Sequence, residues 1–506
     1  MTIASPRAGA STCAMQPTVP VYEYQPVSRI KRSCLEAVTL FLHEAVSTVL
    51  SWSILLVITT IAFYQTRYNT NHDSARRHIE DDHHDPQEEI TQDESYYARR
   101  WGYISENYEI VTSDGYVLRM HRVTKGQQSS SGSECINERR PPVLLGHGLF
   151  QCSGAFVLNE ERSLAFALAD QGYDVWMGNT RATGSLHHVS LSHKDPEYWA
   201  WGLKELGAYD WTCQIDFVCQ HTGFDKVAYI GHSQGNAMAF VGLKLRPEYA
   251  SKLTCFIALA PAVFSGTLVS NFPLRHLIAL NSWLYSLIFG RGGFIPIMQF
   301  AQDVCHPVMF SHMAYCMFSY LFSWWDHHWL RRRKPKYFQF TPRPVSARLI
   351  FDWIEGWGKR SVCLYATAPP LQSSDTSTPL LSDFKDTEGE HEDAIKVPLA
   401  VFYGTDDYLV DGERFVRTFE GYEDHGMSQS PMLMSRTASG RHVPPLKSMD
   451  DEEAKRGHNS LFPMLRLVLA ERINGYEHMD TIWAHDNHET TYPGIFHVLE
   501  STTYTA

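Results

Sequence analysis

A short glycine-rich turn stands between a strand-like run and a helix-like run near the middle of the chain. Residues 227–230 have the aliphatic and aromatic side chains of a buried strand, and residues 236–245 continue as a helix. The turn between them reads GHSQG, with Ser233 at its centre. A serine at a sharp turn from strand to helix exposes its hydroxyl at the end of a sheet, and flanking glycines let the two elements approach closely. This segment predicts an α/β fold with Ser233 as a candidate nucleophile.

The same alternation of strand and helix extends along much of the chain. Short apolar runs bounded by turn residues are separated by longer helical runs, an order that predicts a mostly parallel sheet covered by helices on both faces. An Asp-Gly pair predicts the turn of an additional hairpin near the start. The expected strands are 108–112, 116–123, 142–146, 173–177, 227–230, 253–260 and 397–404, and the expected helices are 164–171, 209–222 and 236–245.

A serine hydroxyl needs a base to take its proton and an acid to orient that base. Asp406 and Asp407 follow the apolar run 397–404, where an acid is well placed, and spacing does not separate the two. The candidate base is His478, on a late loop. The competing histidines His485 and His488 suit surface or helix-cap positions better, and His147 and His232 precede the acid and are expected to be structural.

A second glycine-containing loop, GHGLF at residues 146–150, follows an early strand-like run. In α/β proteins that hydrolyse esters with a serine at such a strand-to-helix turn, two backbone N–H groups bind the developing oxyanion. One comes from a loop after an early strand and one from the residue after the nucleophile. The backbone N–H groups of Leu149 and Gln234 are therefore the candidate oxyanion donors.

The N-terminal part contains one long apolar run. Residues 45–64 carry no charge, and about 20 such residues suffice to cross a hydrocarbon core roughly 30 Å thick. We expect a membrane anchor, single-pass or monotopic, at the endoplasmic reticulum, a lipid droplet or the plasma membrane. Basic residues flank the run equally on both sides, so the positive-inside rule gives no orientation.

Composition changes divide the chain into segments. An aromatic- and Met-rich stretch after the first strands is typical of a helical cap over an active site, and two later stretches are polar and without periodicity. The expected segments are a disordered tail (1–37), an anchor helix (38–66), an acidic, His-rich linker (67–95), a first core part (96–264), a cap (265–357), a polar insertion (358–396), a core strand with the acid loop (397–423), a disordered insertion (424–458) and a last core part with His478 (459–506).

Charge and cysteine content argue against other classes of protein. The net charge is −12, and the short basic run 331–334 lies among aromatic residues, so no nucleic-acid partner is expected. The ten cysteines show no CxxC spacing, and a disulfide between Cys305 and Cys316 stays open. Histidines 78, 83 and 84 suit a solvated linker better than a metal site. We expect no metal and no organic cofactor.

Several longer segments resemble the acid lipase family, which includes gastric and lysosomal acid lipases, and within it most closely the fungal membrane-anchored steryl ester hydrolases. The similar segments are EIVTSDGYVLRMHRV, LLGHGLFQCSGAFVLN, LADQGYDVWMGNTR, YDWTCQIDFVCQHTG, YIGHSQGNA, YGTDDYLVD and YEHMDTIWAHD. The resemblance implies an α/β-hydrolase fold with a helical cap. The family pattern Arg-Gly-Asn is replaced here by Arg181-Ala182-Thr183. This difference affects the conformation expected for a local turn and not the expected chemistry.

The resemblance assigns the nucleophile to Ser233, the acid to Asp407, the base to His478 and the oxyanion donors to Leu149 and Gln234. It implies a membrane-associated serine esterase that cleaves steryl esters, with a lipid ester as the molecule bound and a membrane or lipid-droplet surface as the partner. A triacylglycerol lipase with the same residues is the first alternative. An inactive hydrolase fold that binds lipid is the second. The oligomeric state stays open.

Overall fold

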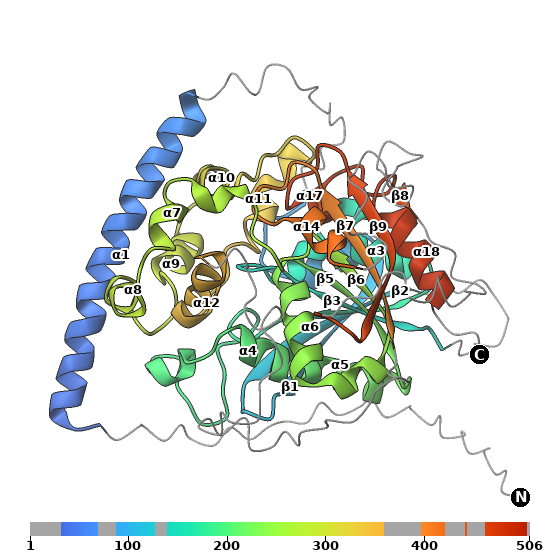
Figure 1. Cartoon of the computed structure of the whole chain (residues 1–506), viewed down its shortest axis with the longest axis horizontal. Coiled ribbons are helices and arrows are strands. Elements are labelled where there is room, and N and C mark those ends of the chain that lie inside the picture. The colour runs from blue at the N-terminus through green and yellow to red at the C-terminus, as the bar shows by residue number, and fades with distance from the viewer. Residues whose placement is uncertain are drawn as a thin grey trace, which may run out of the picture.

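The computed structural model describes residues 32–68, 88–126, 139–358, 396–419, 441–442 and 461–502. These residues form a twisted sheet with flanking helices, a group of cap helices beside it, and one long N-terminal helix outside the cap (Figure 1). The predicted linker histidines 78, 83 and 84 and most of both polar insertions lie outside the described residues.

The described strands form one nine-stranded sheet in the order β1-β2-β4-β3-β5-β6-β7-β9-β8. The neighbours from β4 through β9 run parallel, whereas β1, β2 and β8 are added antiparallel at the edges. The strands are β1 Tyr103–Val111, β2 Val117–Lys125, β3 Pro142–Gly146, β4 Asp174–Gly178, β5 Val227–His232, β6 Leu253–Leu259, β7 Val397–Gly404, β8 Arg441–His442 and β9 Leu465–Ile473. This mostly parallel sheet is the α/β-hydrolase architecture expected from the alternating runs.

Helices connect the strands and build the cap. The core helices are α2 Glu94–Arg100, α3 Leu164–Asp170, α4 Leu203–Glu205, α5 Thr212–Thr222, α6 Gln234–Leu245, α14 Gly412–Arg417, α17 Asp480–Trp483 and α18 Tyr492–Thr502. Between β6 and β7 the chain forms the cap helices α7 Leu274–Leu277, α8 Ser282–Phe289, α9 Ile297–Val304, α10 Pro307–Phe322, α11 Lys334–Tyr337 and α12 Ala347–Gly358. The helix α1, Cys34–Tyr68, precedes them all.

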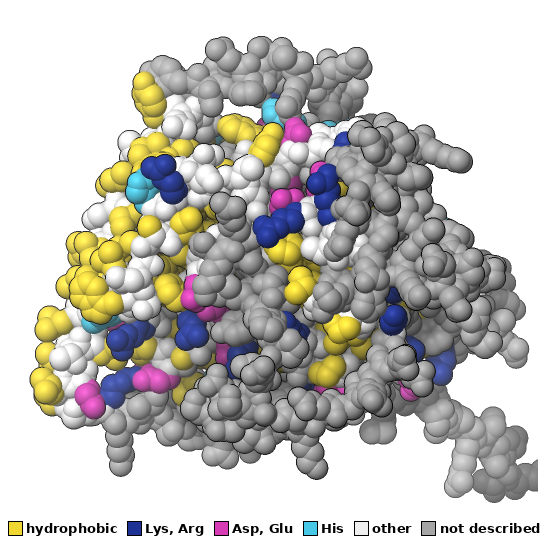
Figure 2. Space-filling view, viewed as in Figure 1, with side chains coloured by type: hydrophobic (Ala, Val, Ile, Leu, Met, Phe, Trp, Pro, Cys, Tyr) yellow, Lys and Arg dark blue, Asp and Glu magenta, His cyan; other side chains and the backbone are white. Residues whose placement is uncertain are grey.

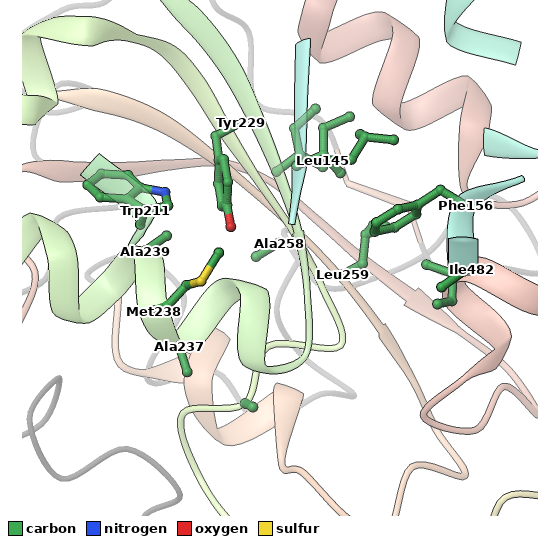
Figure 3. Packing of buried hydrophobic residues seen from close by; sticks show 14 of the residues in the cluster. Leu145, Phe156, Trp211, Tyr229, Ala237, Met238, Ala239, Ala258, Leu259 and Ile482 are labelled. Atoms are coloured by element: carbon green, nitrogen blue, oxygen red, sulfur yellow. The ribbon is translucent and has the colours of Figure 1, made fainter. Parts of the chain in front are cut away.

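Packing around α6 fixes the strand and helix that flank Ser233. Trp211 and Tyr229 meet edge to face with ring centroids 5.9 Å apart, and Met238 of α6 lies beside them (Figure 3). All three side chains are buried, and the Tyr229 hydroxyl donates to the Gly235 carbonyl at 2.8 Å. A buried hydroxyl costs free energy unless it is paired, so this bond ties the strand to the first turn of the helix.

The structure departs from the sequence-based expectations in three places. The helix α1 begins at Cys34, inside the segment 1–37 that was expected to be a disordered tail. Strand β8 lies inside the segment 424–458, which was also expected to be disordered, because its two residues find backbone partners on β9. Strand β9 itself was not predicted; its apolar run, residues 467–470, is short and lies between Arg466 and Glu471.

Among the described residues, one helix, Cys34–Thr66, is long and apolar enough to cross a membrane. A signal sequence near an N-terminus passes the same test of length and composition. This part of the chain is therefore either a membrane segment or a signal sequence by composition alone.

Candidate active site

The turn at Ser233 has a strained backbone that two glycines make possible. Ser233 has φ 52° and ψ −113°, a conformation that residues with a side chain rarely adopt. A Cβ on Gly231 would overlap Asn236, and a Cβ on Gly235 would overlap the Gly146 carbonyl. The turn thus aims the Ser233 hydroxyl away from the sheet and leaves the hydroxyl at the start of α6.

The structure brings Ser233, His478 and Asp407 into one hydrogen-bonded chain. Nε2 of His478 lies 2.7 Å from the Ser233 Oγ, and Nδ1 of His478 lies 2.8 Å from Asp407 Oδ2. A carboxylate only accepts, so Nδ1 carries the proton and Nε2 is left as the acceptor for the serine hydroxyl. This tautomer is the one that a general base beside a serine requires.

The carboxylate of Asp407 is held in place by the backbone after it. Its other oxygen accepts hydrogen bonds from the N–H groups of Leu409 at 3.0 Å and Val410 at 3.1 Å. The neighbouring Asp406 accepts instead from the Thr405 hydroxyl at 3.1 Å. Of the two acids that spacing left open, Asp407 is the one in contact with His478.

Cap and core side chains enclose His478. The Trp324 ring, from the loop after α10, stacks parallel to the imidazole with centroids 6.1 Å apart. Behind it, Nε2 of His232 lies 3.1 Å from the His478 carbonyl, and Nδ1 of His232 lies 3.1 Å from Gln151 Oε1. Burial, together with the nearby His478, holds the pKa of His232 well below its usual range, so the ring is neutral and its single N–H serves one of these two acceptors.

The loops that carry Leu149 and Gln234 meet beside Ser233. Among the described residues, neither backbone N–H has a hydrogen-bond acceptor, so both are available to a ligand. The Gln151 side chain accepts from the Gly148 N–H at 3.0 Å and fixes the first loop. The Gln234 side chain accepts from Trp353 Nε1 of the cap helix α12 at 3.0 Å, so the cap contacts the residue that follows the serine.

A narrow pocket, open to solvent on one side, lies over the serine. Its polar groups are those around Ser233, Gln151 and His478, and the rest of its wall is almost wholly apolar. The apolar lining comprises Leu149, Phe150, Ala262, Phe322, Trp324, Trp353, Trp357, Leu409, Val410 and Met479.

The other histidines weighed from the sequence lie elsewhere. His147 is buried, its Nε2 accepts from the Thr180 N–H at 3.2 Å, and burial lowers its pKa to about 4. Nδ1 of His485 lies 2.9 Å from the His328 carbonyl, and Nδ1 of His488 lies 3.2 Å from the His485 carbonyl. Each of these rings has a structural partner in the backbone.

The described residues contain no group of three or more His, Cys, Asp or Glu side chains that could hold a metal ion. Cys305 and Cys316 are both free thiols in the structure. The geometry around Ser233 suits acyl transfer by a serine nucleophile.

Sequence reasoning missed Gln151, Trp324 and Trp353, three residues that support the site. The two tryptophans belong to the aromatic stretch from which a cap was expected, but nothing in that stretch marks which rings face the serine. Gln151 directly follows the GHGLF loop, and that position is the only signal that could have drawn attention to it.

Comparisons with known proteins agree with this geometry. A family model described as a partial α/β-hydrolase lipase region matches residues 94–160, and one described as the α/β hydrolase fold matches residues 141–286. The chain is 34% identical over 321 residues to gastric triacylglycerol lipase of Mus musculus, an alignment that covers 62% of this chain and 78% of that lipase.

Two further relatives carry other names. Lipase member K of Homo sapiens is 36% identical over 262 residues, which cover 50% of this chain and 64% of the relative. Sterol esterase 2 of Saccharomyces cerevisiae is 31% identical over 359 residues, which cover 66% of this chain and 65% of the relative. The chain thus spans slightly less than two thirds of each of these two proteins.

The chain belongs to the acid lipase family of α/β-hydrolases, the family of gastric triacylglycerol lipase. Its members are carboxylic ester hydrolases, and lipid esters are the substrate class that the family implies.

Proposed function

We propose that this protein is a membrane-associated esterase that cleaves steryl esters into sterol and fatty acid, with Ser233, His478 and Asp407 as its catalytic triad. The observation that carries the proposal is the hydrogen-bonded chain from Asp407 through His478 to Ser233, at the bottom of an apolar pocket. Sterol esterase 2 supports the substrate class. In this reading residues 96–264, 397–423 and 459–506 form the catalytic core, and 265–357 form the cap.

The reaction proceeds in two acyl-transfer steps. Ser233 Oγ attacks the ester carbonyl while Nε2 of His478 takes its proton, and Asp407 holds the ring and stabilises the imidazolium that forms. The negative oxygen of the tetrahedral intermediate accepts from the N–H groups of Leu149 and Gln234. The sterol leaves with the proton from His478, and a water molecule then enters and releases the fatty acid by the same steps.

Triacylglycerol is the second candidate substrate, because gastric triacylglycerol lipase is a comparable relative. The purified chain, assayed side by side on cholesteryl oleate and triolein in the same detergent, should show the higher kcat/KM on the steryl ester. A higher value on triolein would replace the first candidate by the second.

The test of the catalytic assignment is Ser233→Ala, measured with a p-nitrophenyl ester and with a fluorophosphonate probe. Both hydrolysis and labelling should be lost, while the thermal unfolding midpoint stays close to that of the unchanged chain. Retained hydrolysis would refute the assignment of Ser233. An unchanged chain that neither hydrolyses the ester nor reacts with the probe would favour the remaining alternative, an inactive hydrolase fold that binds lipid.

A further inference from the structure

Both ends of α1 are attached to the catalytic domain. Just before the helix, Arg32 forms ion pairs with Asp195, at 3.2 Å, and with Glu197. Near the other end, Thr59 Oγ1 lies 3.3 Å from the Met317 sulfur of α10. Arg32 and Thr59 are 27 residues apart, which is about 40 Å at 1.5 Å per residue, whereas a hydrocarbon core is about 30 Å thick. A helix that crossed a bilayer could not keep both of these contacts on one domain.

The middle of α1 also packs closely against the cap. Oε1 of Glu44 accepts from the Arg291 N–H at 3.2 Å. The neighbouring Gly290 has φ 75°, and a Cβ there would lie 2.9 Å from Glu44 Oε2 and 3.1 Å from Ser47 Oγ. The absence of a side chain at Gly290 therefore lets helix and cap approach each other, as small residues do between helices in membranes.

The exposed face of α1 is apolar, unlike that of a helix in a water-soluble protein. The most buried positions on the side turned to the cap are small residues, with Ser47 and Ser51 2% and 5% exposed, and Leu55 is partly buried against the core there. The side turned outward carries large apolar ones, with Val49 66% and Trp52 47% exposed. A helix at a water interface buries its apolar stripe instead. The exposed large apolar residues of α1 are Leu35, Val38, Phe41, Leu42, Val46, Val49, Leu50, Trp52, Leu56, Val57, Phe63 and Tyr64.

The hydroxyl groups on the outward face need no water. Thr48, Ser53 and Thr60 are exposed, and each donates to the carbonyl four residues earlier in the same helix, at 2.7 to 2.8 Å. In hydrocarbon every polar group must find its partner within the protein. These side chains meet that requirement within α1.

The cap continues the apolar surface beyond α1. Trp283 of α8 is 71% exposed, and further exposed apolar residues lie on α9 and α10. Figure 2 shows hydrophobic side chains gathered on the side of the molecule where α1 and the cap lie. We use the name cap–α1 surface for the outward residues of α1 together with Trp283, Phe300, Val304, Val308, Met309 and Met313.

We infer that α1 lies in the plane of a single phospholipid leaflet, docked on the cap, and that the cap–α1 surface is inserted in that leaflet. The occupant of the surface is the acyl region of phospholipid, of a bilayer or of a lipid-droplet monolayer. This inference rests on the membrane association proposed above and adds its topology. Both ends of the chain then lie on the same side of the membrane.

The first test measures the topology directly. The full chain with Ser233→Ala and a different epitope tag at each end is expressed in sealed microsomes, which are then treated with protease. We expect both tags to be cleaved, or both to be protected. One cleaved and one protected tag would mean that α1 crosses the bilayer and would overturn the inference. Because this chain is inactive by design, the outcome does not depend on the proposed catalytic function.

The second test measures the docking of α1 in the membrane. Thr59→Cys with Met317→Cys, in a Cys34→Ser background and with a protease site added between residues 69 and 87, should crosslink on oxidation and keep α1 attached after cleavage. Thr60→Cys in place of Thr59→Cys is the matched control, because Thr60 faces outward. Equal crosslinking of the two pairs, or none in either, would show that α1 is not docked on the cap.

The third test identifies the occupant. Trp283→Asp with Phe300→Asp should lower co-flotation with phosphatidylcholine vesicles about tenfold, while Ile104→Asp, an exposed position on β1, should not. Unchanged flotation would show that the cap does not contact the lipid. A stable dimer in vesicles that the Asp substitutions dissociate would assign the surface to a second copy of the chain, and would also overturn the inference. Droplets coated with phospholipid, used beside the vesicles, distinguish the two lipid sources.

Discussion

Ala182 occupies a backbone conformation that suits glycine. Its φ is 66°, and it lies beside Arg181, which is fully buried against Asp114 and Asp210. In the left-handed region the Cβ of alanine approaches the following carbonyl, at a cost of about 1–2 kcal/mol. The chain therefore retains a left-handed turn at Ala182 although alanine stands where the family pattern has glycine, and the backbone of this turn is strained.

Ala182→Gly should raise the free energy of unfolding by up to about 1 kcal/mol, because relief of the strain exceeds the entropy that glycine adds to the unfolded chain. Thermal unfolding of the Ser233→Ala chain with and without the change measures it. Ala167→Gly, in the middle of α3, is the control and should lower stability by about 0.5–1 kcal/mol. A lower midpoint for Ala182→Gly would mean that the Ala182 methyl group packs favourably.

The two neighbouring acids are expected to differ sharply in their effect on catalysis. Asp407→Asn removes the charge that holds Nδ1–H of His478, and we expect kcat to fall about 10⁴-fold with little change in KM. Asp406→Asn alters only the contact with Thr405 and should leave kcat within about twofold. Steady-state kinetics on a soluble p-nitrophenyl ester compare the two variants, and similar losses in both would contradict the assignment of Asp407.

At the level of elements, the cap helix α12 reaches the site through one indole. The hydrogen bond from Trp353 to the Gln234 side chain joins the cap to the first residue of α6, whose backbone N–H is a proposed oxyanion donor. Trp357, one turn further along α12, lines the same pocket, but its indole nitrogen has no hydrogen-bond partner among the described residues.

Trp353→Phe should lower kcat about fivefold, since one net hydrogen bond is worth about 1 kcal/mol and its loss frees the residue after the nucleophile. Trp357→Phe removes the same atoms without a hydrogen bond and should change KM more than kcat. Kinetics of both variants on one ester separate the two effects. Equal losses of kcat would show that pocket volume, and not the hydrogen bond, matters at Trp353.

At the scale of the whole molecule, burial makes stability depend on pH. Asp480 lies two residues after His478, fully buried, where it accepts from Trp329 Nε1 at 2.9 Å and from the Glu477 N–H at 2.7 Å. Burial raises its pKa to about 7 in the folded protein, compared with about 4 in an unfolded chain. The folded state therefore binds more protons than the unfolded state between these values.

It follows that the contribution of Asp480 to stability is fully present below about pH 4 and is lost as pH rises through about 7, at up to about 1.4 kcal/mol per pH unit. Asp480→Asn should flatten this slope, whatever its effect on the absolute stability. Chemical denaturation of the Ser233→Ala chain at intervals from pH 4 to 8 measures it. Parallel slopes with and without Asp480→Asn would mean that the carboxyl is ionised throughout.

The sequence specifies the fold where local signals are strong. The boundaries predicted for 142–146 and 397–404 agree with β3 and β7, because each is an apolar run bounded by breakers and buried on both faces. It fails for β9, whose apolar run of residues 467–470 is short and lies between Arg466 and Glu471. For the site, the sequence alone does not distinguish Asp406 from Asp407. The backbone conformation after β7 places Asp407 next to His478. The packing of α1 on the cap could not be predicted, because residues 45–64 carry no charge that would distinguish one side of the helix from the other.

The glycine contacts behind Ser233 bear on how such an enzyme changes its substrate range. A Cβ on Gly231 would overlap the side chain and backbone of Asn236, one on Gly235 would overlap the backbone of Gly146, and one on Gly146 would overlap Tyr229. The rear wall of the site therefore has no adjustable volume, and directed evolution there would yield mainly unfolded chains. New acyl or alcohol selectivity has to come from cap positions such as Phe322 and Trp357, which line the pocket without supporting the turn.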